Sequence, residues 1–299
     1  MVAGMNQGPT TTRFAPSPTG LLHLGHAYCA LFAHHLARRV GGRFLVRLED
    51  IDPGRCRAHF EAALLEDLRW LGLDWDGPVR RQSEHMSEYR RALEMLETQG
   101  LLYPCFCTRK DIEAEIARSG HAPHGPDGGL YPGTCRGLSA AERNRRRQAG
   151  LSFALRLDMG RAMALAGPLF WQDREVGTIA ARPDLFGDVV LARKDTPASY
   201  HLAVCWDDAL QGVTLISRGA DLFAATHVHR LLQALLGLPV PDYQHHPLLT
   251  DANGRRFAKR DHALTIAALR DQGLTSQQVR VMAGFDSVSQ YSDLREMRP

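Results

Sequence analysis

The chain has 299 residues, of which 44% are hydrophobic and 23% charged, and its formal net charge is +3. This composition is ordinary for a soluble globular enzyme of one large domain or two modest ones, and so small a charge argues against a dedicated nucleic-acid binder. No apolar run reaches the length of a membrane span and the polar N-terminus lacks a secretory pattern, so we expect a cytoplasmic protein.

The first hundred residues alternate between strand and helix patterns. The predicted elements are a strand at 12–16, a helix at 26–40, a second strand at 43–48, and helices at 57–71 and 85–99. Prolines end the first strand, and Gly41-Gly42 terminates the first helix. Strand, loop, helix and strand within about forty residues are typical of a βαβ unit in a parallel sheet.

Residues 101–150 change character, because they hold three cysteines, several glycines and prolines, and only short helical patterns. Ser139 is followed three residues later by Glu142, which is a capping-box pattern for a helix start. We interpret this stretch as an insertion. The elements expected beyond it are strands at 152–157, 188–193 and 213–218, a helix at 222–236, and helical structure after Asp261.

A candidate nucleotide site lies where the first loop meets the first long helix, at His23-Leu24-Gly25-His26. A parallel sheet binds its ligands at such strand-to-helix loops, and free N–H groups at a helix start favour phosphate. Gly25 leaves room for a nucleotide, and the two histidines can donate hydrogen bonds to phosphate. By itself H-x-G-H is weak, since a pair of capping or surface histidines gives the same pattern.

The wider context resembles the class I aminoacyl-tRNA synthetases specific for glutamate. The segment Arg13 to His26 is similar to their "HIGH" motif with its glutamate-type lead-in, and Arg256-Phe257-Ala258-Lys259-Arg260 falls where the family has its "KMSKS" motif. Leu48 to Asp52, and Asp188 to Asp195 followed by Tyr200 to Ala203, resemble two further blocks. The resemblance implies an α/β fold with a Rossmann-like parallel sheet, a zinc-binding insertion and a C-terminal helical segment.

The resemblance also implies an adenylation reaction. The carboxylate of L-glutamate attacks the α-phosphate of ATP, assisted by His23, His26, Lys259 and Mg²⁺, with His23, Gly25, His26 and Lys259 binding ATP. Only the second lysine of KMSKS remains, as Lys259. One cation on that loop can still neutralise triphosphate charge.

The amino-acid site implied by the resemblance combines two cations with an anion. Arg13 and Ser17 hold glutamate from the first loop, Glu49 pairs with its amino group, and Tyr200 and Arg218 complete the pocket. An arginine fork suits a carboxylate because it binds both oxygens. Taken alone, an arginine at a strand end is more often a surface ion pair of little consequence.

Three clustered thiols in the insertion favour a structural Zn²⁺ site over a disulfide in a reducing compartment. The candidate ligands are Cys105, Cys107 and Cys135, with Tyr131 as the fourth by resemblance to truncated relatives. His121 or His124 is the chemically simpler fourth ligand, and a metal-free site is the remaining alternative. Cys29, Cys56 and Cys205 are expected to be small buried or half-buried thiols.

The basic run Arg143 to Arg147 is by default a solvated helix face, although it could also bind an RNA backbone. With 38 residues after Asp261, we expect no anticodon-binding domain. The chain in this respect resembles the glutamyl-Q tRNA(Asp) synthetases, which imply transfer of glutamate to the queuosine base at the wobble position of tRNA(Asp). Two alternatives stay open: a minimal synthetase that charges the tRNA 3′ end, and an inactive regulator that binds glutamate or RNA.

These assignments divide the chain into five predicted segments. We also expect the protein to be a monomer. The predicted segments are a flexible arm at 1–12, the first half of the catalytic domain at 13–100, the zinc-binding insertion at 101–165, the second half at 166–250, and the KMSKS-like loop with a helical C-terminus at 251–299.

Overall fold

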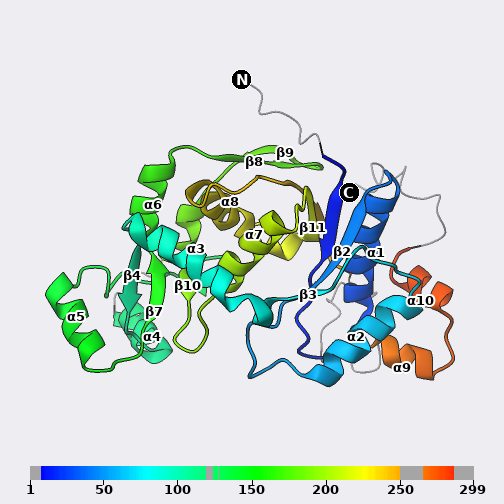
Figure 1. The fold of residues 1–299 in the computed structure, drawn as a ribbon, viewed down its shortest axis with the longest axis horizontal. Helices are drawn as coiled ribbons and strands as arrows, with labels where there is room; N and C mark the ends of the chain where they lie inside the picture. The colour runs from blue at the N-terminus through cyan, green and yellow to red at the C-terminus, as the bar shows by residue number, and fades with distance from the viewer. Residues whose placement is uncertain (1–7, 119–123, 127, 250–264, 286–299) are drawn as a thin grey trace. The chain divides into compact units, whose positions relative to one another are not determined.

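The computed structural model describes residues 8–118, 124–126, 128–249 and 265–285 (Figure 1). The loop that carries Lys259, together with His121, therefore lies outside the described residues, as does the side chain of His124. The described residues form two compact units. The first comprises 8–83, 213–221, 243–249 and 265–285, and the second comprises 84–212 and 222–242.

The first unit is built around a short parallel sheet. Its elements are β1 (Thr11–Phe14), α1 (Leu24–Arg38), β2 (Arg43–Leu48), α2 (Ala58–Trp70), β3 (Arg80–Arg81), β11 (Leu215–Gly219), β12 (Asp242–His246), α9 (Ile266–Asp271) and α10 (Ser276–Met282). The strands β1, β2 and β3 are hydrogen-bonded in that order and run parallel, which confirms the predicted βαβ unit. Strand β11 lies beside β1, because the Thr214 N–H donates to the Thr11 carbonyl at 3.0 Å.

The turn from α1 into β2 requires two glycines. Gly41 has a φ of 65°, and a Cβ on Gly42 would lie 2.2 Å from the carbonyl oxygen of Thr10. That carbonyl accepts the first inter-strand hydrogen bond, from Arg43 N–H at 2.8 Å. Thr11 and Thr12, which the sequence places in the N-terminal arm, are the first residues of β1 and are buried.

Helix α1 packs its apolar face on β1 and β2, and the two C-terminal helices pack on α1 and α2 (Figure 1). The core of the first unit contains Leu31, Phe44 and Leu68, together with Ile266 and Val279 from α9 and α10. The chain beyond the KMSKS-like loop therefore contributes to the same core as the nucleotide motif.

The second unit joins a helical group to a small antiparallel sheet. Its helices are α3 (Met86–Thr98), α4 (Arg109–Arg118), α5 (Ala140–Gln148), α6 (Met159–Ala166), α7 (Tyr200–Leu210) and α8 (Ala225–Leu235). Its strands are β4 (Leu102–Cys105), β5 (His124–Gly125), β6 (Gly128–Gly129), β7 (Ala154–Leu157), β8 (Phe170–Asp173), β9 (Gly177–Ala180) and β10 (Val190–Ala192). The sheet order is β10-β7-β4, and β8 and β9 form a hairpin.

The described residues also include three short 3-10 helices: η1 (Gln82–His85), η2 (Pro183–Phe186) and η3 (Ala220–Leu222). The helix predicted at 222–236 begins at Ala225 in the structure, three residues later, and the 3-10 turn η3 ends at Leu222. Within the described part of the chain, no helix combines the length and apolarity that a membrane span needs.

Candidate functional site

The two histidines of H-x-G-H form a capping box at the start of α1. His23 is the N-cap residue, and its Nδ1 accepts a hydrogen bond from the Gly25 N–H at 3.1 Å. In return, Nδ1 of His26 accepts from the His23 N–H at 3.3 Å. The structure therefore contains the histidine cap that the sequence left open as an alternative. This cap determines which ring nitrogen of each histidine can donate a hydrogen bond.

Because each Nδ1 accepts a hydrogen bond, a neutral ring must carry its proton on Nε2 in both residues. The two rings stack with centroids 3.8 Å apart. The capping box thus selects, in two adjacent imidazoles, the tautomer that donates through Nε2. Such a pair of oriented donors at a helix N-terminus is suited to stabilising developing charge on a phosphate.

Gly25 lies close to the His23 ring, with little room for a side chain. A Cβ at this position would lie 3.1 Å from Cε1 and 3.2 Å from Nδ1 of the His23 ring. An alanine would therefore push against the ring that caps the helix.

The chain returns to this motif after the KMSKS-like loop. Thr265 forms an isolated antiparallel bridge with His23, and the Ile266 N–H donates to the Leu22 carbonyl at 2.9 Å. Leu249, on the other side of the loop, packs against the core of the first unit. Both ends of the segment that carries Lys259 are therefore joined to the unit that holds the histidines.

Two buried arginines lie next to each other at the ends of β1 and β11. The Arg13 side chain is 5% exposed, and its Nη1 donates to the carbonyl of Ser217 at 3.2 Å. The residue after Ser217 is Arg218, which is 6% exposed. Both are too deeply buried to be the surface ion pairs that were the simpler interpretation of strand-end arginines. Both arginines thus lie near the carboxyl ends of their strands, where a parallel sheet binds its ligands.

Glu49 follows the end of β2, on the strand next to β1. Its N–H donates to the Pro16 carbonyl at 3.0 Å, which places it against the loop that contains Ser17. Ser17 is exposed, and its carbonyl accepts from the Thr19 N–H at 2.8 Å. The first unit thus brings Arg13, Ser17, Glu49 and Arg218 to one edge of its sheet.

Arg47 is a residue of this site that the sequence did not single out. Its side chain is completely buried near the end of β2, and its Nη2 lies 3.4 Å from Oε1 of Glu49. The sequence does contain a hint of this role, because Arg47 is a single charged residue between the apolar residues 44–46 and Leu48. The arginine lies within ion-pair distance of the Glu49 carboxylate and helps to orient it.

Tyr200 is the first residue of α7, in the second unit. Its ring contacts the imidazoles of His201 and His229, with centroids 5.6 and 5.5 Å away. Those two histidines are joined by a hydrogen bond of 3.1 Å. The structure thus places Tyr200 in an aromatic cluster of its own unit.

The cysteine cluster of the second unit has the dimensions of a tetrahedral metal site. The sulfurs of Cys105, Cys107 and Cys135 all lie within 4.8 Å of one another, and the Cys107–Cys135 distance is 3.5 Å. The Tyr131 hydroxyl lies 3.4 Å from Cys105 Sγ and 3.6 Å from Cys107 Sγ. With bonds of about 2.3 Å to sulfur and 2.0 Å to oxygen, a tetrahedral zinc would need S–S edges of about 3.8 Å and S–O edges of about 3.5 Å.

The backbone around the cluster favours anionic ligands. The N–H of Cys135 donates to the Tyr131 oxygen at 2.8 Å, and that of Phe106 donates to Cys135 Sγ at 3.4 Å. Without a cation, burial raises the pKa of Cys107 to about 12 and also raises the pKa of the Tyr131 phenol. A bound metal would have to displace these protons. The thiols of Cys29, Cys56 and Cys205 are half-buried or buried, as expected.

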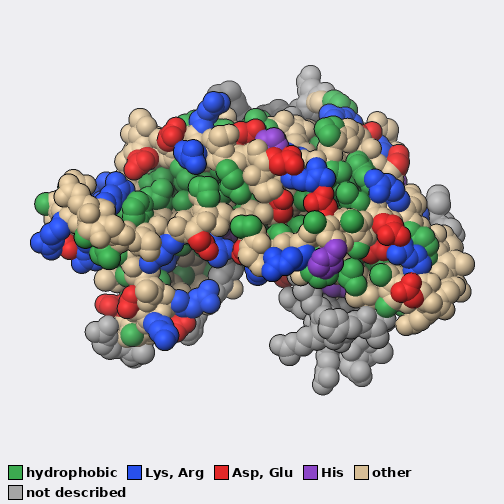
Figure 2. Space-filling model, turned by 60° about the horizontal axis from the view of Figure 1, so that its bottom comes forward, with side chains coloured by type: hydrophobic (Ala, Val, Ile, Leu, Met, Phe, Trp, Pro, Cys, Tyr) green, Lys and Arg blue, Asp and Glu red, His purple; other side chains and the backbone are tan. Residues whose placement is uncertain are grey.

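The basic run on α5 is in large part structural. Arg143, Arg146 and Arg147 place their guanidinium carbons 5.7, 5.6 and 4.8 Å from the ring centroids of Tyr103, Phe106 and Phe153. Figure 2 shows Lys and Arg side chains gathered at its left, the side on which Figure 1 draws α4 and α5. No residue of α5 is buried, so the solvated face expected by default is present, and cation–π contacts also tie these three arginines to aromatic rings beside the helix.

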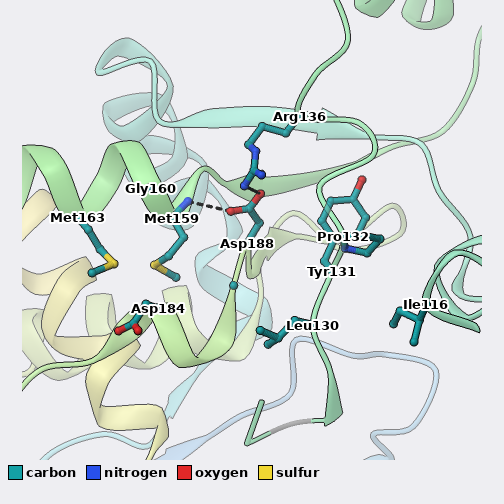
Figure 3. A pocket seen from close by; sticks show the side chains of 11 residues that line it. Ile116, Leu130, Tyr131, Pro132, Arg136, Met159, Gly160, Met163, Asp184 and Asp188 are labelled. Carbon is teal, nitrogen blue, oxygen red and sulfur yellow. Dashed lines mark hydrogen bonds and ion pairs between the residues drawn. The ribbon is translucent and has the colours of Figure 1, made fainter. Parts of the chain in front are cut away.

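Asp188 joins the cysteine region to the rest of the second unit. Its carboxylate accepts from the Tyr103 hydroxyl at 2.5 Å, from Arg136 Nη1 at 2.9 Å and from the Met159 N–H at 3.0 Å. Figure 3 shows this carboxylate beside a cavity of about 390 Å³ that Tyr131 also lines. Sequence placed Asp188 in a family-like block without assigning this role.

Several known proteins are similar to this chain over most of its length. Residues 9–285 match the family described as tRNA synthetases class I (E and Q), catalytic domain. A glutamyl-Q tRNA(Asp) synthetase of Rhodobacter capsulatus is 51% identical over 278 residues, which cover 91% of this chain and 99% of that protein. A glutamate–tRNA ligase of Aquifex aeolicus is 39% identical over 88% of this chain, but the match covers only 54% of that ligase.

Among solved structures, a glutamate tRNA ligase from Elizabethkingia meningosepticum in complex with its amino acid is similar with a TM-score of 0.72 and 28% identity. The similarity covers 85% of this chain and 52% of that chain.

Proposed function

Because the chain belongs to the class I tRNA synthetases for glutamate and glutamine, we propose that it activates L-glutamate with ATP and transfers it to the queuosine base at the wobble position of tRNA(Asp). The observation that carries the proposal is the 51% identity to the Rhodobacter capsulatus protein over nearly its whole length. Relatives named for the same reaction in Nocardia farcinica and Deinococcus radiodurans are 45% and 44% identical.

In the proposed activation step, an oxygen of the glutamate α-carboxylate attacks the α-phosphorus of ATP. The bond to the leaving pyrophosphate breaks, and glutamyl-adenylate forms. The Nε2–H groups of His23 and His26 donate to phosphate oxygens as charge builds on them, and Lys259 neutralises charge on the pyrophosphate. Mg²⁺ bound to the triphosphate would supply further charge neutralisation.

The glutamate pocket in this proposal uses the edge of the first unit. Arg13 and Arg218 bind carboxylate, Ser17 donates from the loop, and Glu49 receives the ammonium group. The Arg47 guanidinium, 3.4 Å from Glu49, supports this role because the contact helps to orient the Glu49 carboxylate. Tyr200 completes the set of proposed glutamate ligands.

We also propose that Cys105, Cys107, Cys135 and Tyr131 hold a structural Zn²⁺. All four donors would be used, so the ion would have no open position for a substrate. Zinc content of purified protein tests this assignment. One equivalent in the wild type and its loss in Cys107→Ser are expected, and undiminished zinc in that variant contradicts the assignment.

Pyrophosphate exchange with glutamate and no tRNA tests the activation step. Exchange is expected in the wild type and a drop of at least a hundredfold in Lys259→Ala. A folded protein without exchange would instead support the inactive regulator.

Transfer is tested with labelled glutamate and two preparations of tRNA(Asp), with and without queuosine. Label that depends on queuosine supports the proposal, whereas label on tRNA(Glu) would support 3′-end charging. We propose that the reaction takes place in the cytoplasm and that the enzyme acts as a monomer.

A further inference from the structure

Arg218 is held from strand β12 by a histidine that no motif singles out. The Nε of Arg218 donates to Nε2 of His245 at 3.1 Å, and both side chains are buried, at 6% and 9% exposed. Strands β11 and β12 are neighbours in one sheet, so the contact is built into the strand pairing.

A second residue of β12 contacts the same guanidinium. Its central carbon lies 5.3 Å from the ring centroid of Tyr243, which is fully buried. Tyr243 and His245 are two positions apart on one strand, so both side chains project from the same face of the sheet. Their rings are nearly parallel, with an interplanar angle of 5° and centroids 6.0 Å apart. The guanidinium is thus fixed by a hydrogen bond at its inner nitrogen and by an aromatic face beside it.

Holding Nε fixes the direction in which the terminal Nη pair points. A guanidinium is planar, so an anchored Nε leaves little freedom to the fork that binds a carboxylate. The geometry also requires a neutral His245 with its proton on Nδ1, because Nε2 is the acceptor. A lysine at 218 could not reproduce this, since it has a single charged nitrogen and no separate anchoring group.

We infer that His245 is a positioning residue for glutamate recognition: it aims the Arg218 fork at a carboxylate of the amino acid without touching the substrate. The inference rests on the proposed function, in which Arg218 binds glutamate. By this inference, strand β12 contributes to the specificity for glutamate, which the H-x-G-H motif and the KMSKS-like loop do not provide.

The test is the steady-state kinetics of glutamate-dependent pyrophosphate exchange in two variants. His245→Leu removes the acceptor and keeps an apolar body, and it should raise KM for glutamate at least tenfold while KM for ATP changes less than twofold. His245→Gln can accept from Arg218 through its amide oxygen, and it should stay within about threefold of the wild type. Gln244→Leu, on the opposite face of β12, is the matched control for loss of a polar side chain from this strand and should leave KM for glutamate unchanged.

A double-mutant cycle separates this inference from the proposed function. If His245 acts through Arg218, adding His245→Leu to Arg218→Lys should raise KM for glutamate no further. If Arg218→Lys leaves KM for glutamate unchanged, the proposed role of Arg218 fails. If Arg218→Lys raises it and His245→Leu does not, the positioning inference alone is overturned. Equal increases in KM for glutamate and for ATP in His245→Leu would also overturn it, since they indicate general disruption of the fold.

Discussion

Replacing Asp67 with asparagine should stabilise the protein at neutral pH. Asp67 lies on α2 with its side chain fully buried, and neither carboxylate oxygen has a hydrogen-bond donor among the described residues. Arg270 of α9 approaches Oδ1 only to 3.8 Å, while the same guanidinium nitrogen pairs with Glu66 at 3.0 Å. The buried carboxylate is therefore poorly compensated when it is charged.

The size of the effect follows from the pKa of this group. Burial raises the pKa of Asp67 from 3.8 to about 6, and the attraction of Arg270 offsets part of the increase. Below about pH 3.8 the carboxyl is neutral in both folded and unfolded chains, so it costs nothing. As pH rises above 3.8 the unfolded chain ionises while the folded chain keeps its proton, so stability is lost until pH passes about 6, where the folded carboxyl ionises as well. A difference of about two pKa units corresponds to at most about 3 kcal/mol, fully expressed above pH 7.

Urea denaturation of the wild type and Asp67→Asn at several pH values is the assay. The variant should be more stable by about 1–3 kcal/mol at pH 8, and the difference should shrink toward zero as pH falls to 4. The control is Glu66→Gln, because Glu66 is 64% exposed and its pair with Arg270 should contribute less than about 1 kcal/mol at any pH. A gain that does not vary with pH, or a loss of stability at pH 8, would refute the reasoning.

Three other variants test the remaining geometry. Gly25→Ala should lower pyrophosphate exchange roughly tenfold without unfolding the protein, because its Cβ would press on the His23 ring; unchanged exchange would show that this ring tolerates displacement. Tyr131→Phe should bind zinc roughly tenfold more weakly in a chelator competition, and unaltered affinity would favour one of the histidines as fourth ligand. Arg47→Met should lower the free energy of unfolding by about 3 kcal/mol, measured by urea denaturation, because it removes a buried cation that lies 3.4 Å from the largely buried Glu49 carboxylate. A change below about 1 kcal/mol would mean that Arg47 does not compensate Glu49.

Sequence predicted the first unit well because its signals are local. Strand β2 occupies the predicted range 43–48, and helix α2 lies within one residue of its predicted ends, as does helix α3 of the second unit. Glycines and capping residues mark these boundaries within a few positions of the chain. The Ser139 capping pattern was confirmed for the same reason, since Ser139 Oγ accepts from the Glu142 N–H.

The second unit was predicted less completely. Helix α7 and the β8–β9 hairpin were not predicted from pattern, although the block around Tyr200 had been noticed by resemblance. Helix α7 is buried on several sides, so its sequence lacks the regular alternation of apolar and polar residues that marks a surface helix. Asp207 and Asp208 are buried, as are Leu202 and Cys205. Asp207 accepts a hydrogen bond from a distant partner, the hydroxyl of Tyr89, 118 positions away. No local pattern reports a partner at such a separation.

The candidate site shows the same division. Residues inside motifs could be identified from the sequence, whereas those that orient them could not, because His245 and Arg218 are 27 positions apart and meet only through strand pairing. Arg47 is two positions from Glu49, but only its complete burial distinguishes it from an ordinary strand arginine.

An isolated β-bridge joins His23 to Thr265, the first described residue after the KMSKS-like loop that carries Lys259. Thr265 follows Lys259 by six residues and caps α9, and α9 is joined to α2 through the Arg270–Glu66 pair. The return point of the segment that carries Lys259 is therefore fixed by backbone hydrogen bonds next to the two histidines proposed to bind ATP, within the same unit.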